Sequence, residues 1–199
     1  MERIGEVIES STIGFTVGTY ELLQAPAFGS LVRAQARAED QSIYALVYDI
    51  RTGSKEPGGR AVVRGRTYTG RDLYDHEIYQ EHPDLAEVLQ TEFSAITVGF
   101  SEYGRIYQYL PPLPPPVHYS VYQCSNEELV EFSNNSDFFR TILFAAQLPS
   151  DELLCAAVRA FARVQRDGHS YLLRAGREIA NLLKDDYDRL VAILRRIQP

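Results

Sequence analysis

The chain has 199 residues, which is enough for one large domain or two small ones, each with its own hydrophobic core. Its 45% hydrophobic and 24% charged residues are ordinary for a folded protein. A net charge of −7 disfavours broad attraction to nucleic acid or to an anionic membrane.

The cysteine content and the apolar runs indicate the compartment. The two cysteines, Cys124 and Cys155, are too few and too unpatterned for a disulfide framework or a zinc site. The start, MERIGEVIES, is interrupted by charges and lacks the apolar centre of a signal peptide. The best apolar run, TILFAAQL, is far too short to span a bilayer. These features predict a cytoplasmic protein with reduced thiols and no membrane span.

The first part of the chain, residues 1–110, is dominated by strand patterns. Alternating or β-branched residues indicate strands within 3–9, 12–22, 28–37, 42–50, 93–104 and 105–110. The run SIYALVYDI is apolar on both faces, which indicates a centrally buried strand. Glycines inside strands, such as Gly5 and Gly14, fit the sharp bends of a small barrel. We therefore predict a small closed or nearly closed β-barrel here.

One long excursion, at about 51–91, interrupts these strands. It opens with the loop-like RTGSKEPGGR and ends with HPDLAEVLQTEF, which predicts a short helix after Pro83. Gly53 and Gly58 have the spacing of a Walker A phosphate loop, but Gly59 and Arg60 replace its Lys-Ser/Thr pair. A flexible loop is the favoured interpretation, and we expect no nucleotide or other cofactor.

The excursion also carries two clusters of functional residue types. Arg60, Arg64 and Arg66 surround Tyr68, an arrangement that can hold a single nucleic-acid strand by charge and stacking. The acidic segment that follows favours pairing within the chain instead. In that segment Asp72, His76 and His82 are metal-ligand types, but they match no named motif. An exposed acidic linker is favoured over a metal site, and we predict no metal.

A proline-rich strap occupies residues 111–124. Every residue from Pro111 to Pro116 except Leu113 is proline, so the strap is a short, semi-rigid spacer. Three tyrosines lie around its prolines: Tyr107, Tyr109 and Tyr119. They fit a partner interface and equally fit filler between domains. We expect the strap to pack on the barrel, with a PxxP ligand for another protein as the alternative.

The last part, residues 125–199, has helical periodicity. Ser125 and Glu128 match a capping box, and about five helices follow, with Ser150 as the predicted cap of the helix DELLCAAVRAFARVQ. On that helix Leu154, Val158 and Phe161 share an apolar face. Arg159, Arg163 and Arg166 form a basic stripe, which indicates a solvated face or a dock for an acidic partner. The fold class is therefore α+β, a barrel followed by a helical bundle or arm.

The strands RIGEVIESSTIGFTVGT, IYALVYDIRTG and EFSAITVGFSEYG, with the strap PPLPPPVHYSV, resemble a HAS-barrel domain. This small barrel lies at the N-terminus of HerA-type DNA-translocating ATPases and of the F-type ATP synthase α and β subunits. The likeness is greater to the HerA type, in which a RecA-like motor follows the barrel. Here the residues after His118 are mostly helical and carry no phosphate loop. The resemblance therefore implies subunit assembly and partner docking without the ATPase activity.

No catalytic constellation is evident. The sequence has no Gly-x-Ser-x-Gly element and no cysteine with an activating neighbourhood. We therefore predict a noncatalytic interaction or assembly factor that binds a protein partner or itself. The alternative is an accessory protein that binds single-stranded nucleic acid or a DNA-processing complex through Arg60, Arg64, Arg66 and Tyr68 with the Arg159 stripe.

Overall fold

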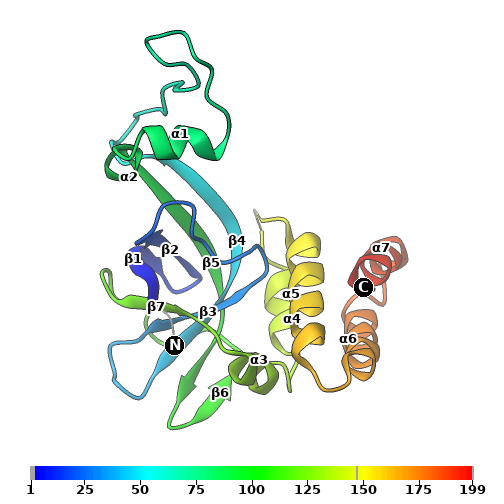
Figure 1. Ribbon diagram of the computed structural model, residues 1–199. Coiled ribbons are helices and arrows are strands. Elements are labelled where there is room, and N and C mark those ends of the chain that lie inside the picture. Colours follow the sequence, from blue (N-terminus) through cyan, green and yellow to red (C-terminus); the bar gives the residue numbers. More distant parts are fainter. Residues whose placement is uncertain (1–2, 147, 199) are drawn as a thin grey trace.

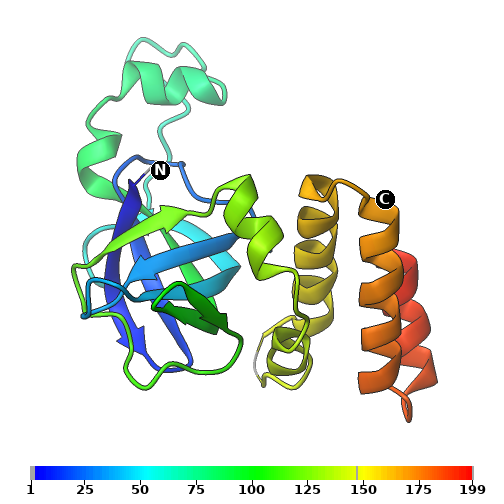
Figure 2. The same cartoon turned by 90° about the horizontal axis from the view of Figure 1, so that it is seen from below.

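A computed structural model describes residues 3–146 and 148–198 of the chain. A β-barrel, a helical region beside the barrel wall, and an arm that projects from one end of the barrel make up the molecule (Figure 1). Seen from below, the helices lie in successive layers away from the barrel (Figure 2). The predicted α+β class, with an N-terminal barrel followed by helices, is confirmed.

The barrel is one antiparallel sheet that closes on itself. In the described residues its strands are β1 (Arg3–Ser11), β2 (Gly14–Thr19), β3 (Leu31–Gln35), β4 (Ser42–Ser54), β5 (Leu89–Glu102), β6 (Arg105–Tyr107) and β7 (Ser120–Gln123). The strand order is β2-β1-β7-β3-β4-β5-β6, and β2 also pairs with β5, which closes six strands into a barrel. Closure pairs the strand edges that an open sheet would leave free.

The strand β4 has two buried faces, as its sequence predicts. Ile43, Ala45 and Val47 belong to the core inside the barrel. Tyr44 and Leu46, which alternate with them, belong to a second core between the barrel wall and the helices. The apolar run is therefore explained by helices that cover the outside of the barrel.

A close approach of two strands explains one of the barrel glycines. A Cβ atom on Gly5 of β1 would lie 2.2 Å from the carbonyl oxygen of Gly18 on β2. No side chain fits at that distance, so glycine is required where these strands meet.

The excursion between β4 and β5 is shorter than the predicted range 51–91. The ladder between the two strands continues to the pair Ser54 and Leu89, so both ends of the predicted range are strand. The helix expected after Pro83 is α2 (Leu85–Val88), which ends where β5 begins. Pairing with β4 overrides the local helical pattern of the following residues. We call residues 55–88 the arm; it also contains α1 (His76–Glu81).

The strand β7 lies beyond the prolines, within the range 111–124 that the sequence indicates as strap. It pairs with β1 on one side and β3 on the other. The barrel therefore needs residues after position 110 to close.

The strap packs along β1, in agreement with the prediction. The Ser10 hydroxyl donates to the Pro115 carbonyl at 2.5 Å. The Val7 amide donates to the Tyr119 carbonyl at 3.0 Å, and the His118 amide donates to the Val7 carbonyl at 2.7 Å. These bonds guide the chain from the prolines into β7, so the strap is part of the barrel wall.

Five helices follow β7 in the described residues: α3 (Asn126–Phe132), α4 (Phe138–Leu143), α5 (Ser150–Val164), α6 (Gly168–Leu182) and α7 (Tyr187–Ile197). Ser125 and Glu128 form the predicted capping box on α3. The prediction that Ser150 caps α5 is wrong. The N-cap position is Pro149, and the Ser150 hydroxyl accepts from Arg189 of α7 at 3.2 Å instead.

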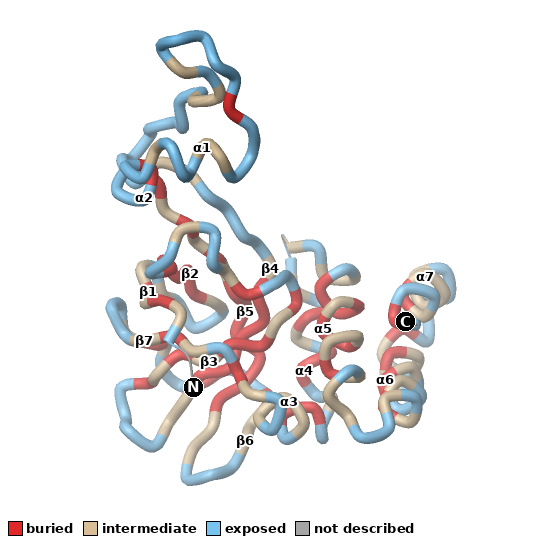
Figure 3. Tube along the Cα trace, viewed as in Figure 1, coloured by how far each residue is buried: buried red, intermediate tan, exposed pale blue. Residues whose placement is uncertain are grey.

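The largest apolar core lies between the barrel and the helices (Figure 3). Phe132 of α3 is at its centre: its ring lies 5.2 Å from the ring of Tyr44 on β4 and 5.2 Å from that of Phe138 on α4. On α5, the face predicted from Leu154, Val158 and Phe161 is buried. The barrel wall and the helices therefore form a single packed unit.

Two polar contacts also cross this junction. The buried Gln108 amide donates to the carbonyls of Phe132 and Asn135, at 2.7 and 3.3 Å, and its oxygen accepts from the Phe138 amide at 3.3 Å. Arg33 of β3 pairs with Glu128 of α3 at 2.8 Å, with both side chains largely buried. The helices are thereby held in one register on the barrel.

Candidate interaction surfaces

The arginines of the arm are mostly paired within the arm. The ion pairs join Arg64 to Asp84 at 3.5 Å, Arg66 to Asp72 at 2.9 Å, and Arg71 to Glu81 at 2.8 Å. Of the residues that the sequence singled out, only Arg60 and Tyr68 make no ion pair or ring contact with any described residue. Because the charges are neutralised locally, the arm presents little positive field to a phosphate backbone.

The arm does not assemble a metal site. Asp72 is held by Arg66, and the His82 imidazole has a buried Nε2 without a hydrogen-bond partner among the described residues. In the part of the chain that the structure describes, no three His, Cys, Asp or Glu side chains come together as a metal would require. The residues Asp72, His76 and His82 are thus not gathered around one point.

Two of the three strap tyrosines form an aromatic cluster with a barrel residue. The Tyr107 ring stacks on Phe100 with ring centroids 5.1 Å apart, and Tyr109 lies 5.4 Å from Phe100 and 5.6 Å from Tyr107. Tyr119 has no ring contact with any described residue and lies where the strap turns into β7. Tyr107 is filler at the barrel end, whereas Tyr109 is 59% exposed and available to a partner.

The arginines of the helical region are arranged differently from the prediction of one stripe. Arg159 and Arg163 lie on α5, but α5 ends at Val164, so Arg166 lies in the turn to α6. Arg159 donates to the carbonyl of Arg196 on α7. Arg163 and Arg166 have no ion-pair partner within residues 3–146 and 148–198. These two charges are therefore open to solvent, in contrast to those of the arm.

A small hollow lies beside these arginines, where the turn between α5 and α6 meets the end of α7. Its volume is about 310 Å³. Its lining residues, which we call the basic hollow, are Arg159, Ala162, Arg163, Gly168, His169, Leu172 and Ile197. A Cβ on Gly168 would lie 2.6 Å from the Ala162 carbonyl oxygen, so the tight turn requires glycine.

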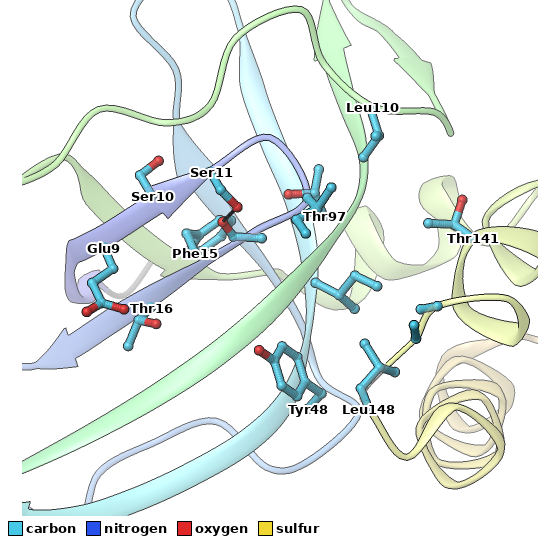
Figure 4. Close-up of a pocket in the computed structure, with 15 residues that line it drawn as sticks. Glu9, Ser10, Ser11, Phe15, Thr16, Tyr48, Thr97, Leu110, Thr141 and Leu148 are labelled. Atoms are coloured by element: carbon cyan, nitrogen blue, oxygen red, sulfur yellow. Dashed lines mark hydrogen bonds between the residues drawn. The ribbon is translucent and has the colours of Figure 1, made fainter.

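A larger cleft of about 660 Å³ lies between the β1–β2 hairpin, the barrel wall and the loop after α4 (Figure 4). We call it the barrel–helix cleft; it is lined by Glu9, Ser10, Ser11, Ile13, Gly14, Phe15, Thr16, Tyr48, Ile96, Thr97, Leu110, Thr141, Ala145, Ala146 and Leu148. Apolar side chains from both the barrel and the helical region dominate this set. The cleft exists only because the two parts are packed together.

Thr97 is the unusual polar residue of the cleft. It is fully buried, and its Oγ1 atom has no hydrogen-bond partner among the described residues. Its backbone amide is satisfied by the Ile13 carbonyl at 3.0 Å. A buried hydroxyl without a partner is unfavourable, so Thr97 is a local cost to the stability of the junction.

The thiols of the two cysteines, Cys124 and Cys155, are not activated. Burial raises the pKa of the Cys124 thiol well above its usual range, with a further contribution from the nearby Glu128 carboxylate. Burial likewise raises the pKa of Cys155 to about 11. Both thiols are therefore protonated near neutral pH and lack the reactive thiolate form.

Gln108 and Thr97 are the important polar residues that sequence reasoning missed. Both lie in strand-like runs, RIYQYL and FSAITVGFSEYG, where a polar residue among apolar neighbours is the available signal. That signal does not say whether the side chain faces solvent, the barrel interior or the helices. Only the pairing of β5 and β6 with the rest of the barrel decides the direction.

Comparison with known proteins agrees with the barrel. The family model of the HAS barrel domain matches residues 4–103, just over half of the chain. None of the curated proteins matches the chain at a significant level. No helix among the described residues has the length and apolar character to cross a membrane. With its closed six-stranded barrel and this match, the chain belongs to the HAS-barrel family.

Proposed function

We propose that the protein is a noncatalytic interaction or assembly factor that holds a segment of a partner protein in the barrel–helix cleft. The observation that carries the proposal is this cleft, whose lining combines apolar side chains from both parts of the molecule with a few polar ones, such as Ser11 and Thr141. An apolar cleft with a few polar groups is the usual character of a binding site. A peptide segment can supply both an apolar side chain and a hydrogen-bonding group.

The charge of the cleft favours a protein segment over nucleic acid. Glu9 is the one charged residue in its lining, and its carboxylate would repel a phosphate backbone. Exposed Ile13 and Leu110 at the rim would instead be covered by an apolar partner surface. The cleft therefore fits a partner that buries apolar area.

The family resemblance supports an assembly role. In HerA-type proteins a motor follows the barrel, and the barrel serves docking and assembly. In this chain the helices α3–α7 follow instead and pack on the barrel wall. Helices that add binding surface to the barrel, in place of a motor, are consistent with an interaction module.

Partner capture with a cleft variant tests the proposal. Tagged protein and its Ile13→Asp variant are incubated with cytosol from the source cells, with nuclease present, and the retained proteins are identified. Ile13 is 67% exposed, so the substitution leaves the fold intact while placing a charge at the cleft. Val63→Asp, a change at a side chain 94% exposed on the arm, is the matched control.

We expect a discrete partner that is retained by the wild type and by Val63→Asp and is lost with Ile13→Asp. A partner that is retained equally by all three proteins would reject the cleft. Measurable nucleotide turnover by the purified protein, lost on Lys55→Ala, would reject the noncatalytic assignment. Sedimentation of the same proteins would report self-association, and cell fractionation would check the predicted cytoplasmic location.

The alternative function, an accessory protein for single-stranded nucleic acid, keeps support from one observation. Arg163 and Arg166 make no ion pair with any described residue, whereas Arg64 and Arg66 of the arm are both paired. Fluorescence anisotropy of a labelled oligo-thymidine at about 50 mM salt tests it, because such binding is strongest at low salt. Binding that is lost on neutralising the arginines would favour this function, and no binding at low salt would remove it.

A further inference from the structure

The basic hollow lies at one end of the helical region, where three segments distant in sequence meet. The last turn of α5, the first turn of α6 and the last turn of α7 come together there, and Figure 2 shows the C-terminal end of the chain close to the turn between α5 and α6. The arginines of this end are Arg159, Arg163, Arg166, Arg195 and Arg196. A concentration of positive charge therefore occupies one end of a protein whose net charge is −7.

Much of this positive charge is not compensated by the residues that the structure describes. Arg196 pairs with Glu152, and Arg159 is used to join α5 to α7. Arg163, Arg166 and Arg195 make no ion pair or cation–π contact with any residue that the structure describes. The nearest acidic residue in sequence, Asp167, already accepts two bonds from Ser170, at 3.0 and 2.6 Å, as the cap of α6. The arginines therefore have spare capacity for carboxylates from outside.

The floor of the hollow is aliphatic. Ala162, Leu172 and Ile197 line it, and Ile197 is buried. The volume of about 310 Å³ lies at the low end for ligand sites, so it suits an aliphatic side chain better than a large ligand. No phenylalanine, tyrosine or tryptophan lines the hollow, so it lacks the stacking platform on which single-stranded nucleic acid depends.

We infer that the basic hollow docks a short acidic segment of another protein, with one aliphatic side chain inserted over Leu172 and Ile197. Its carboxylates pair with Arg163 in the lining and with Arg166 in the adjoining turn between α5 and α6. Charge complementarity supplies orientation and rapid association, and the aliphatic side chain supplies the buried anchor. The surface is distinct from the barrel–helix cleft, because no residue lines both.

Selection of a displayed library of short random peptides against the full chain tests this inference without assuming a sequence. We expect enriched peptides in which Asp or Glu residues flank a Leu, Ile, Val or Met. The enrichment should disappear against Arg163→Glu and persist against Arg177→Glu. Arg177 is the matched control because it is an exposed arginine on α6 that does not line the hollow.

Anisotropy with the best enriched peptide then gives the magnitudes. Arg163→Glu and Arg166→Glu should each weaken binding about tenfold, since each reverses a charge in or beside the hollow. Replacing the aliphatic anchor of the peptide by Ser should weaken it by about tenfold or more, because the buried apolar area is lost. Raising salt from about 50 to 200 mM should weaken it further. Circular dichroism of each variant checks that the fold is unchanged.

Three results would overturn the inference: enriched peptides that are not acidic or no enrichment at all; equal loss of binding with Arg177→Glu; or tighter binding of an oligo-thymidine of matched charge. The last result would assign the surface to nucleic acid. The Ile13→Asp variant should bind the acidic peptide as the wild type does. Failure of the cleft proposal and failure of this inference are therefore distinguishable.

Discussion

The arm and the helical region are both additions to a six-stranded barrel, yet they are stabilised in different ways. The arm leaves the barrel between β4 and β5 and returns with few buried side chains, among them Leu73 and Leu85. Its charged side chains form exposed ion pairs, such as Arg66 with Asp72. The helical region shares a continuous apolar core with the outer barrel wall. The same chain thus carries one peripheral and one integral extension.

The contrast also explains why two groups of arginines that look alike in the sequence differ in how far they are free to bind a partner. In the arm, the arginines are followed by an acidic segment that folds back on them. Their charges are therefore paired locally. In the helical region the arginines that gather at one end of α5, α6 and α7 are Arg159, Arg163, Arg166, Arg195 and Arg196. Of these, Arg163, Arg166 and Arg195 make no ion pair with any described residue. Exposed ion pairs contribute only about 0–1 kcal/mol each, so the arm should open locally more readily than the helices.

Cysteine labelling should give the largest difference between the two regions. Cys124 and Cys155 are buried in the shared core, and their thiols are protonated near neutral pH. We expect them to react with a thiol reagent at pH 8 only as the whole protein unfolds. A cysteine introduced by Val63→Cys in the arm should react faster by on the order of a thousandfold or more. Stopped-flow labelling measures both rates, and rapid reaction of Cys155 in the native protein would contradict the single packed unit.

A pair of core truncations tests whether the barrel and helices unfold together. Phe132→Ala removes the ring that joins Tyr44 to Phe138, and we expect a loss of about 3–5 kcal/mol in the free energy of unfolding. The matched change in the arm, Leu85→Ala, should leave the main transition nearly unchanged, because the arm opens without it. Urea unfolding followed by circular dichroism measures both. Two separate transitions for the wild type would show that the barrel and helices are independent.

Truncation of Gln108 tests the polar part of the same junction. Gln108→Ala leaves the Phe132 carbonyl and the Phe138 amide without their partner, so we expect a loss of about 2 kcal/mol. Gln123→Ala, at an exposed position of β7, is the control and should cost much less. Thermal unfolding of the three proteins makes the comparison. Equal stability of the two variants would mean that water replaces the amide at the junction.

Removal of the arm should have the smallest effect. Replacing residues 57–86 by a short Gly-Asn turn keeps the β4–β5 pairing at Ser54 and Leu89 and removes only peripheral contacts. The free energy of unfolding should change by no more than about 1 kcal/mol. The exposed ion pairs that are lost contribute little, and a shorter loop has a smaller entropic cost of closure, which offsets their loss. Urea unfolding measures the change. A barrel that no longer folds would show that the arm is integral and would remove the contrast between the two regions.

The sequence by itself determined the features that depend on neighbouring residues. The two-sided burial of β4 was readable because apolar residues occupy both strand faces, and the capping box of Ser125 and Glu128 lies within one helical turn. The change from a strand period to a helical period after the strap predicted the α+β order. These patterns are local, so the chain specifies them before any long-range contact forms.

Tertiary structure alone decided the features that join distant residues. The strand β7 closes the barrel by pairing with β1 and β3, although it follows the prolines, and β5 begins at Leu89 because β4 pairs there. The cleft around Thr97 and the basic hollow at Arg163 each need segments that are remote in sequence. Whether an arginine is paired, or a hydroxyl is left without a partner, depends on which remote atoms arrive beside it, and a one-dimensional pattern does not contain that information.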